Sequence, residues 1–397
     1  VKDTFPCPYC GSELTKDNLQ KVFETRPDPA SKKPWRHIKY QPSLISYTFA
    51  GKRYEKQPDI HDLEILKQIE AMPFPVELPT NRFPIEYMYH GSRIEPKGFT
   101  HIHHFFMPRS SQLLSAFFQK ILSHNNTRIA SGILLIAQHQ FQNASIMNRY
   151  RPASSFGNAP LGGVYYVPSQ IAEANVIRLI SGSMKRVDRM AKAGWTHLSV
   201  MSKPITISTH STTEAYGVLD NSIDYIFTDP PFGENIYYAD LNFLVESWYR
   251  VITNSTQEAI VDKFKRKGLP EYQQLMQRCF EEYYRVLKPG RWMTVVFDNS
   301  RNAVWNAIQL GMQAAGFVVA DVRTLDKQQG SYRQVTSTAV KQDLVISAYK
   351  PNGGLEERFK LTAGTEDGVW DFIRTHLKQL PVFVSKDSQA EIIAERQ

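Results

Sequence analysis

The sequence predicts an α/β fold, in which a central sheet is covered by helices on both faces, and three observations indicate it. After about residue 200, strand-like and helix-like patterns alternate along the chain. The expected strands are uniformly apolar, which is typical of strands buried on both faces of a sheet. The last two expected strands are joined by a long polar segment without a helical pattern, so we expect them to pair antiparallel.

The elements expected in this part follow one another in a simple order. They are strands at 205–208 and 223–227, helices at 239–251 and 271–287, a strand at 292–297, a helix at 302–315, and strands at 318–325 and 344–349. The first 200 residues are less regular and show no internal repeat. They predict proline-rich loops and short strands over 21–100 with one short helix near 61–71, two helices between 110 and 140, an exposed loop at 142–166 and a helix from about 169 to 192.

The composition excludes several classes of protein. Hydrophobic residues make up 42% of the chain and charged residues 22%, as in globular proteins. No apolar run approaches the roughly 18 residues that span a bilayer, and the N-terminus lacks the pattern of a secretion signal. Three cysteines cannot form a disulfide framework, so we expect a cytoplasmic location and no membrane partner. A chain of 397 residues suits two domains, and its start at Val1 suggests a processed or truncated piece.

The charge favours a polyanionic partner. The net charge is +8, and no Asp or Glu occurs between Glu95 and Glu173. That stretch contains six Lys or Arg residues and five histidines. A surface that faces phosphates has this composition, because an acid there would repel the ligand. The alternative is a chance gap over a partly buried polar segment.

Two segments contain cysteines or histidines that could bind a metal ion. Cys7-Pro8-Tyr9-Cys10-Gly11 has the shape of half a zinc knuckle, whereas a structural zinc site needs four ligands. Either upstream sequence or nearby histidines would have to supply the second pair. The His101-x-His103-His104 run is another set of possible ligands, but phosphate contact or packing is the favoured interpretation.

The segment with the clearest candidate functional residues begins with an apolar strand at 223–227. Asp229-Pro230-Pro231-Phe232 follows the end of this strand. Ligands of open α/β sheets bind beyond the carboxyl ends of strands. Two prolines make this loop rigid. An aromatic amine is a poor nucleophile, and the Asp229 carboxylate and the Pro230 carbonyl could activate it by accepting hydrogen bonds from its N–H groups. Phe232 offers a face on which an extruded base can stack.

This tetrapeptide resembles the Asp/Asn-Pro-Pro-Tyr/Phe signature of amino-methyltransferases that act on adenine N6 or cytosine N4 of DNA. The similarity extends to the runs at 220–228, 235–244 and 285–292, which look like large bacterial DNA methylases associated with restriction or phage defence. The segment at 98–105 resembles the insert of that group. The resemblance covers most of residues 95–350, and the alternative is a Pro-Pro turn that closes a strand by accident.

The resemblance implies a Rossmann-like methyltransferase sheet, S-adenosylmethionine as cofactor, and adenine N6 of a flipped-out DNA base as target. It implies a half zinc-knuckle at 1–20 with Cys7 and Cys10 as metal ligands, a target-recognition region at 21–195, a catalytic domain at 196–352 and a helical extension at 353–397. The expected catalytic residues are Asp229, Pro230, Pro231 and Phe232, and the expected cofactor contacts are Thr228, Asp229, Gly233 and Asn299. The expected nucleic-acid contacts are His103, His104, Arg109, Arg149, Arg151 and Arg333. Expected partners are DNA and subunits of a restriction or defence system.

One departure from the family pattern keeps two other functions open. Such enzymes hold the cofactor on a glycine-rich loop after a strand, and the glycine-bearing run at 155–163 does not follow a strand or open a helix. The chain would then begin inside the insert, and the cofactor would bind weakly or require another chain. The alternatives are a guanine-N2 methyltransferase of RNA, which uses a similar tetrapeptide, and a non-catalytic subunit or fragment that binds DNA.

Overall fold

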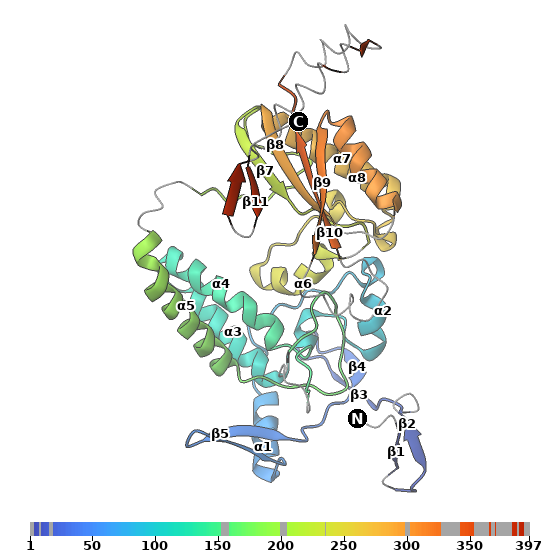
Figure 1. Cartoon of the computed structure of the whole chain (residues 1–397). Helices are drawn as coiled ribbons and strands as arrows, with labels where there is room; N and C mark the ends of the chain where they lie inside the picture. The colour runs from blue at the N-terminus through green and yellow to red at the C-terminus, as the bar shows by residue number, and fades with distance from the viewer. Residues whose placement is uncertain are drawn as a thin grey trace. The chain divides into compact units, whose positions relative to one another are not determined.

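The computed structural model describes residues 4–7, 9–15, 19–151, 159–198, 205–234, 236–297, 302–326, 342–352, 365–366, 370, 383–386 and 389–392. The chain forms two compact units, whose residues can be followed by number along the colour bar of Figure 1. Unit 1 comprises residues 1–204 and 238–253, and unit 2 comprises residues 205–237 and 254–397. No described helix is long and apolar enough to cross a membrane.

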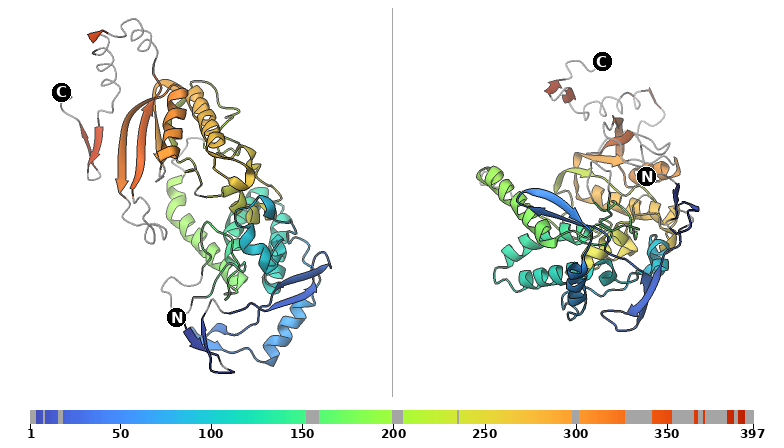
Figure 2. Two further views of the ribbon diagram at one scale, coloured as in Figure 1. Left: turned by 90° about the vertical axis from the view of Figure 1, so that its right-hand side faces the viewer. Right: turned by 90° about the horizontal axis from the view of Figure 1, so that it is seen from below.

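Unit 1 combines small hairpins with a group of helices. Its strands are β1 (Thr4–Pro6), β2 (Glu13–Thr15), β3 (Phe23–Pro27), β4 (Pro34–Ile38), β5 (Ile45–Phe49) and β6 (Lys52–Lys56), which pair antiparallel as three hairpins. Its helices are α1 (Ile60–Glu70), α2 (Gly91–Ile94), α3 (Pro108–Leu122), α4 (Thr127–Asn143), α5 (Val176–Leu198) and α6 (Tyr238–Tyr249), with 3₁₀ turns η1 (Ile85–Tyr87), η2 (Glu95–Lys97) and η3 (Ile102–Phe105). Helices α3, α4 and α5 pack on one another, as Figures 1 and 2 show.

The core of unit 1 is built on aromatic side chains. Trp248 of α6 is 1% exposed and stacks on Phe141 of α4, with ring centroids 4.5 Å apart. Phe106 and Phe118 contact the same indole edge-on. Helix α6, which follows the Asp-Pro-Pro-Phe segment in sequence, therefore belongs to the core of unit 1 by its packing.

Unit 2 contains the predicted α/β sheet. Its elements are β7 (Ile223–Thr228), η4 (Ser255–Gln257), η5 (Lys263–Lys265), α7 (Leu269–Val286), β8 (Leu287–Phe297), α8 (Asn302–Ala314), β9 (Val318–Asp326), β10 (Gln342–Tyr349), β11 (Phe383–Lys386) and β12 (Gln389–Ile392). Four strands form one sheet in the order β7-β8-β10-β9. Strands β7 and β8 are parallel, whereas β10 is antiparallel to both β8 and β9. The α/β class and the antiparallel pairing of the last two expected strands are confirmed.

Helices α7 and α8 pack together on one face of this sheet (Figure 2). They share a core with Met293, Val295 and Phe297, which alternate along β8. The opposite face carries Tyr225 and Phe227 of β7, which are 53% and 65% exposed. The helices predicted for this second face are not among the described residues of unit 2.

Three expectations for local structure are corrected. Residues 205–208 form no strand, and Ile205 and Ile207 are at least 80% exposed, because no neighbouring strand pairs with them among the described residues. The segment 144–148, expected in an exposed loop, is buried. It is held there by hydrogen bonds such as that from the Ile146 N–H to the Phe105 carbonyl. Helix α5 begins later than expected, at Val176.

Candidate active site

The Asp-Pro-Pro-Phe loop lies at the carboxyl end of β7, as the sequence predicted. Strand β7 pairs with β8 up to Thr228, so Asp229 is the first residue beyond the sheet. Asp229 is exposed, and Pro230, Pro231 and Phe232 are half-buried. Gly233 is buried with φ of +71°, a left-handed conformation that favours glycine and turns the chain away from the strand direction. The carboxylate is thus presented at the edge where open α/β sheets bind ligands.

Three contacts hold this loop in place. The Tyr272 hydroxyl of α7 donates to the Pro231 carbonyl at 2.8 Å. The Val261 N–H donates to the Gly233 carbonyl at 3.2 Å. The Phe232 ring meets Phe297 edge-on, with centroids 5.2 Å apart. With the Pro231 and Gly233 carbonyls occupied in this way, the loop has a fixed direction.

Val261 belongs to a loop that is held in place by a buried carboxylate. Asp262 is 0% exposed and accepts hydrogen bonds from the N–H groups of Phe264 and Lys265. The Lys265 ammonium also lies 2.9 Å from Asp262 Oδ2. Lys267 closes the same loop by donating to the Ser255 and Glu258 carbonyls. The loop at 254–268 is therefore a rigid support for the Gly233 end of the candidate site.

A pair of hydroxyls lies where the strand ends. Thr228 Oγ1 and the Tyr283 hydroxyl are 3.1 Å apart. Burial raises the pKa of Tyr283 above its usual value, although the contact with Thr228 opposes the shift, so this phenol stays protonated. Sequence patterns did not single out Tyr272 or Tyr283, because on a helix they look like ordinary core aromatics. The expected cofactor contact Asn299 lies outside the described residues.

His103 and His104, expected to contact nucleic acid, are instead inside unit 1. Both are 5% exposed, and their Nε2 atoms lie 2.9 and 2.7 Å from Asp28 Oδ2. Asp28 Oδ1 accepts the N–H groups of Ala30 and Ser31. These histidines connect the β3–β4 turn to η3 and cannot reach a phosphate, which corrects that expectation.

The Asp28–His103–His104 cluster is the group among the described residues whose ligand atoms lie close enough to hold a metal. The hydrogen bonds of His104 argue against metal binding by this cluster. Its Nδ1 accepts the N–H groups of Thr100 and His101, so the neutral ring carries its proton on Nε2 and donates it to Asp28. This tautomer leaves no lone pair on Nε2 for a metal ion, and the cluster is explained by its hydrogen bonds.

The half zinc-knuckle is a tight turn between β1 and β2. The Gly11 N–H donates to the Cys7 carbonyl, and the Cys10 thiol donates to Ser12 Oγ at 3.3 Å. The Ser12 contacts, followed by that of Cys7, hold the pKa of Cys10 below its usual value. Among the described residues no third ligand joins the two cysteines, so the turn contains one of the two ligand pairs that a four-ligand zinc site needs.

The arginines expected to contact nucleic acid differ in their surroundings. Arg109 is exposed, but its guanidinium pairs with Glu173 at 2.7 Å. Arg149 and Arg151 are half-buried, and Arg149 forms backbone bridges to Ala159 and Ile171. Arg333 lies outside the described residues. Arg109 and Arg149 are therefore held by contacts within unit 1.

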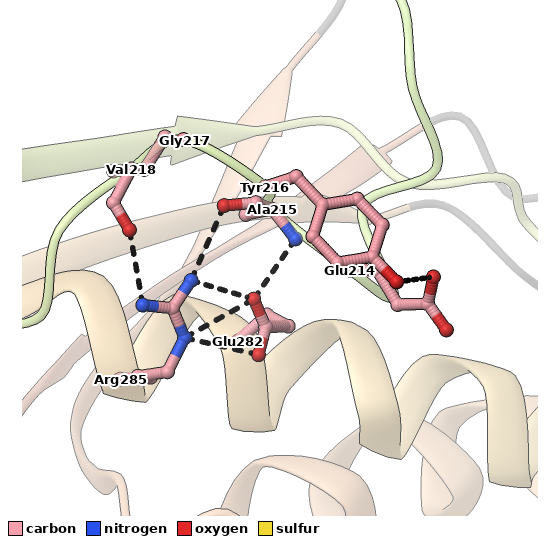
Figure 3. A pocket seen from close by; sticks show the side chains of 7 residues that line it. All are labelled: Glu214, Ala215, Tyr216, Gly217, Val218, Glu282 and Arg285. Carbon is pink, nitrogen blue, oxygen red and sulfur yellow. Dashed lines mark hydrogen bonds and ion pairs between the residues drawn. The ribbon is translucent and has the colours of Figure 1, made fainter.

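A pocket of unit 2 lies at the opposite end of β7 from Asp229. It is lined by residues of the loop before the strand and by Glu282 and Arg285 of α7, as Figure 3 shows. Arg285 donates to the Val218 and Ala215 carbonyls, and Glu282 accepts the Ala215 N–H. These contacts fasten the loop that precedes the strand. Because ligands of open α/β sheets bind at carboxyl ends, this amino-end pocket is a structural feature rather than the candidate active site.

Comparisons of the whole chain with solved structures give low similarity. A protein from Thermus thermophilus that is provisionally described as a DNA modification methylase, solved with S-adenosyl-L-methionine, is 14% identical over 38% of this chain and 57% of its own, with a TM-score of 0.22. A SAM-dependent methyltransferase from Methanosarcina mazei is 12% identical over 43% of this chain and 78% of its own, with a TM-score of 0.23. The [4+2]-cyclase SpnF is 14% identical over 42% of this chain and 62% of its own, with a TM-score of 0.24. None of these similarities supports a functional assignment.

The chain spans only 53% of the first matched structure. No curated protein matches it. Residues 223–379 match a family model, N6_N4_Mtase, whose description is DNA methylase. The matched part begins at β7 and includes the braced loop, α7, β8, α8, β9 and β10. Over residues 223–379, the chain is therefore similar to the DNA methylase family.

Proposed function

We propose that this chain carries the catalytic loop of an S-adenosylmethionine-dependent DNA methyltransferase, and that its target is the exocyclic amine of a flipped-out base, adenine N6 before cytosine N4. The observation that carries the proposal is the position of Asp229. Its exposed carboxylate follows a parallel strand, on a loop braced by Tyr272, Val261 and Phe297, within a segment similar to DNA methylases.

The chemistry follows from the reactivity of the amine. Its lone pair is delocalised into the ring, so a catalyst must favour the pyramidal form. Asp229 accepts a hydrogen bond from one N–H of the amine, and the Pro230 carbonyl accepts a hydrogen bond from the other, since the neighbouring Pro231 carbonyl is already bonded to Tyr272. Groups fixed before the reaction stabilise developing charge without reorganising, which is the largest contribution to many enzymatic rates.

S-adenosylmethionine supplies the methyl group as a reactive sulfonium. Among the residues expected to contact it, Thr228 is engaged with Tyr283, and the Gly233 carbonyl accepts the Val261 N–H. Among the described members of this set, Asp229 is exposed and is the first residue beyond β7. These contacts support Asp229 as the residue that touches the reacting groups, and Thr228 and Gly233 as positioning residues. Zinc has no part in the proposal.

The experiment measures transfer of a tritiated methyl group to unmethylated DNA, with transfer RNA as the competing substrate. Asp229→Ala is the diagnostic variant, because it removes the side-chain acceptor, whereas Asn also occurs at this position of the signature and keeps an acceptor oxygen. Asp224→Ala is the matched control, since Asp224 is an exposed carboxylate of β7 paired with Lys288. We expect transfer to DNA, a loss of about a hundredfold or more in Asp229→Ala, and near-normal transfer in the control.

Other outcomes would change the assignment. Transfer to RNA alone would support the guanine-N2 alternative. DNA binding without transfer would support the non-catalytic subunit. Equal activity of the two variants would remove Asp229 from the mechanism.

A further inference from the structure

We propose that an exposed basic face of α5 binds the phosphate backbone of double-stranded DNA. This face, the α5 stripe, consists of Arg178, Lys185, Arg189 and Lys192. The inference rests on the proposed function for the identity of the polyanion. The stripe was not among the residues that sequence motifs selected for DNA contact.

The charge of the whole chain is concentrated around this helix. Helices α3, α4 and α5 together contain eight Lys or Arg residues and one acid, Asp188. The other parts of the chain contain the remaining 39 Lys or Arg and 38 Asp or Glu residues and are close to neutral. Almost all of the net charge of +8 therefore lies in these three packed helices, and five of the eight basic residues are in α5.

The stripe lies on one side of the helix. Its members are spaced by seven, four and three residues, which places them on a single face over a length of about 21 Å. All four side chains are exposed. On the other side of α5, Val176 and Ser183 are buried, and Ser183 accepts a hydrogen bond from Gln140 Nε2 of α4. The stripe thus faces away from α4.

The surroundings of the stripe neutralise one of its four charges. Helices α3 and α4 contain no Asp or Glu. The single acid of α5, Asp188, pairs with Lys192 at 2.8 Å. Lys185 and Arg189 are like charges one turn apart, an arrangement that slightly destabilises an isolated helix. A phosphate backbone supplies the missing counter-charge, and basic residues that neutralise phosphates release condensed counterions on binding.

An anionic membrane is the competing polyanionic surface. A helix that lies on a membrane uses an apolar face opposite its basic face along its length. In α5 the first half of the corresponding side is buried at Val176 and Ser183 and packs on the core of unit 1 through Leu179 and Ile180. Farther along this side, Met184, Val187 and Met190 are 43%, 40% and 71% exposed. The apolar side is therefore not free along the length of the helix, and this packing, together with the similarity to DNA methylases, favours DNA.

The test compares two variants with the same change in net charge. In the stripe variant, Arg178, Lys185, Arg189 and Lys192 are changed to Gln. In the control, the four exposed lysines Lys33, Lys39, Lys52 and Lys67, which lie in unit 1 outside the three helices, are changed to Gln. Binding of a fluorescent DNA duplex is measured without cofactor over a series of salt concentrations, and circular dichroism verifies that both variants fold.

We expect the stripe variant to bind DNA about tenfold or more weakly, with a salt slope reduced by about 0.9 for each phosphate that the stripe no longer neutralises. The control should keep the wild-type slope. Equal losses in both variants, or wild-type binding by the stripe variant, would overturn the proposal. A stripe-dependent loss of binding to phosphatidylserine vesicles with unchanged DNA binding would overturn it too. Since no methyl transfer is measured, a stripe effect would survive failure of the proposed function.

Discussion

At the residue scale, the candidate site depends on groups that hold the loop as well as on the carboxylate. Removing the Tyr272 hydroxyl leaves the Pro231 carbonyl without its donor and frees one end of the braced loop. Small displacements of reacting groups reduce rates strongly. Tyr272→Phe should therefore lower kcat by about ten- to a hundredfold while KM for DNA changes little.

The matched control for Tyr272→Phe is Tyr216→Phe, which removes an exposed hydroxyl of unit 2 that bonds to Glu214. It should leave both constants unchanged. If Tyr272→Phe raises KM without lowering kcat, the hydroxyl assists binding instead of positioning the loop.

A second residue-scale prediction concerns the pH dependence of unit 1. Burial lowers the pKa of His103 and lowers that of His104 to about 3, against the contact with Asp28 in each case. Burial disfavours ionised Asp28, but hydrogen bonds from His104, the Ser31 N–H and His103 outweigh it and hold its pKa well below the usual value. The cluster is thus a carboxylate with two neutral rings at neutral pH.

The unfolded chain protonates these histidines near pH 6.5, while the folded chain resists protonation. Their stabilising effect is complete above that pH and is lost as the pH falls below 6.5. For His104 the loss continues down to about pH 3, by up to about 1.4 kcal/mol per pH unit. Asp28 adds a further loss below about pH 4. Urea unfolding at a series of pH values should show this slope. His104→Gln should reduce the slope, and His139→Gln, at an exposed site, should not.

At the element scale, strongly periodic segments were predicted well. Helices α3, α7 and α8 and strands β7, β9 and β10 lie within a few residues of their expected positions, because each buries an apolar face. Strand β8 begins five residues before the expected start. The Gly290 N–H donates to the Lys350 carbonyl, so pairing extends through a Pro-Gly sequence that looks like a turn.

Contacts between residues that are far apart along the chain could not be predicted from the sequence. The Asp-Pro-Pro-Phe motif and its place after a strand were evident from local order. That Tyr272 and Val261 would hold its carbonyls was not, because a hydroxyl on a helix and an N–H in a loop have no sequence signature. The histidines were misassigned for the same reason, since their partner Asp28 lies some 75 residues away in the sequence.

The loop at 254–268 gives a prediction at this scale. Asp262→Ala removes the acceptor for two N–H groups and leaves the Lys265 ammonium without its carboxylate. Unit 2 should lose about 2–4 kcal/mol of unfolding free energy, and methyl transfer should fall because Val261 no longer fixes Gly233. Urea unfolding and transfer rates measure the two effects. The control, Glu281→Ala on the exposed side of α7, should change neither, and a loss of stability with full activity would separate the loop from catalysis.

At the scale of the whole molecule, the chain has two separate hydrophobic cores. It passes from unit 2 into unit 1 at residue 238 and returns at 254, so α6 lies in sequence between the Asp-Pro-Pro-Phe loop and its support at 254–268. The Asp-Pro-Pro-Phe segment is consequently joined at one end to a helix whose stability comes from the other unit.

Two cores should unfold in distinct steps. Trp248→Ala empties the aromatic centre of unit 1 and should cost about 3–5 kcal/mol there. Amide hydrogen exchange should then accelerate in α3, α4 and α6, while β8 and β10 keep their protection. Phe280→Ala, in the core of unit 2, should give the reverse pattern. Uniform acceleration in both variants would mean that the units unfold together. In that case core substitutions in unit 1 would also affect the Asp-Pro-Pro-Phe loop, through the short link between Phe232 and α6.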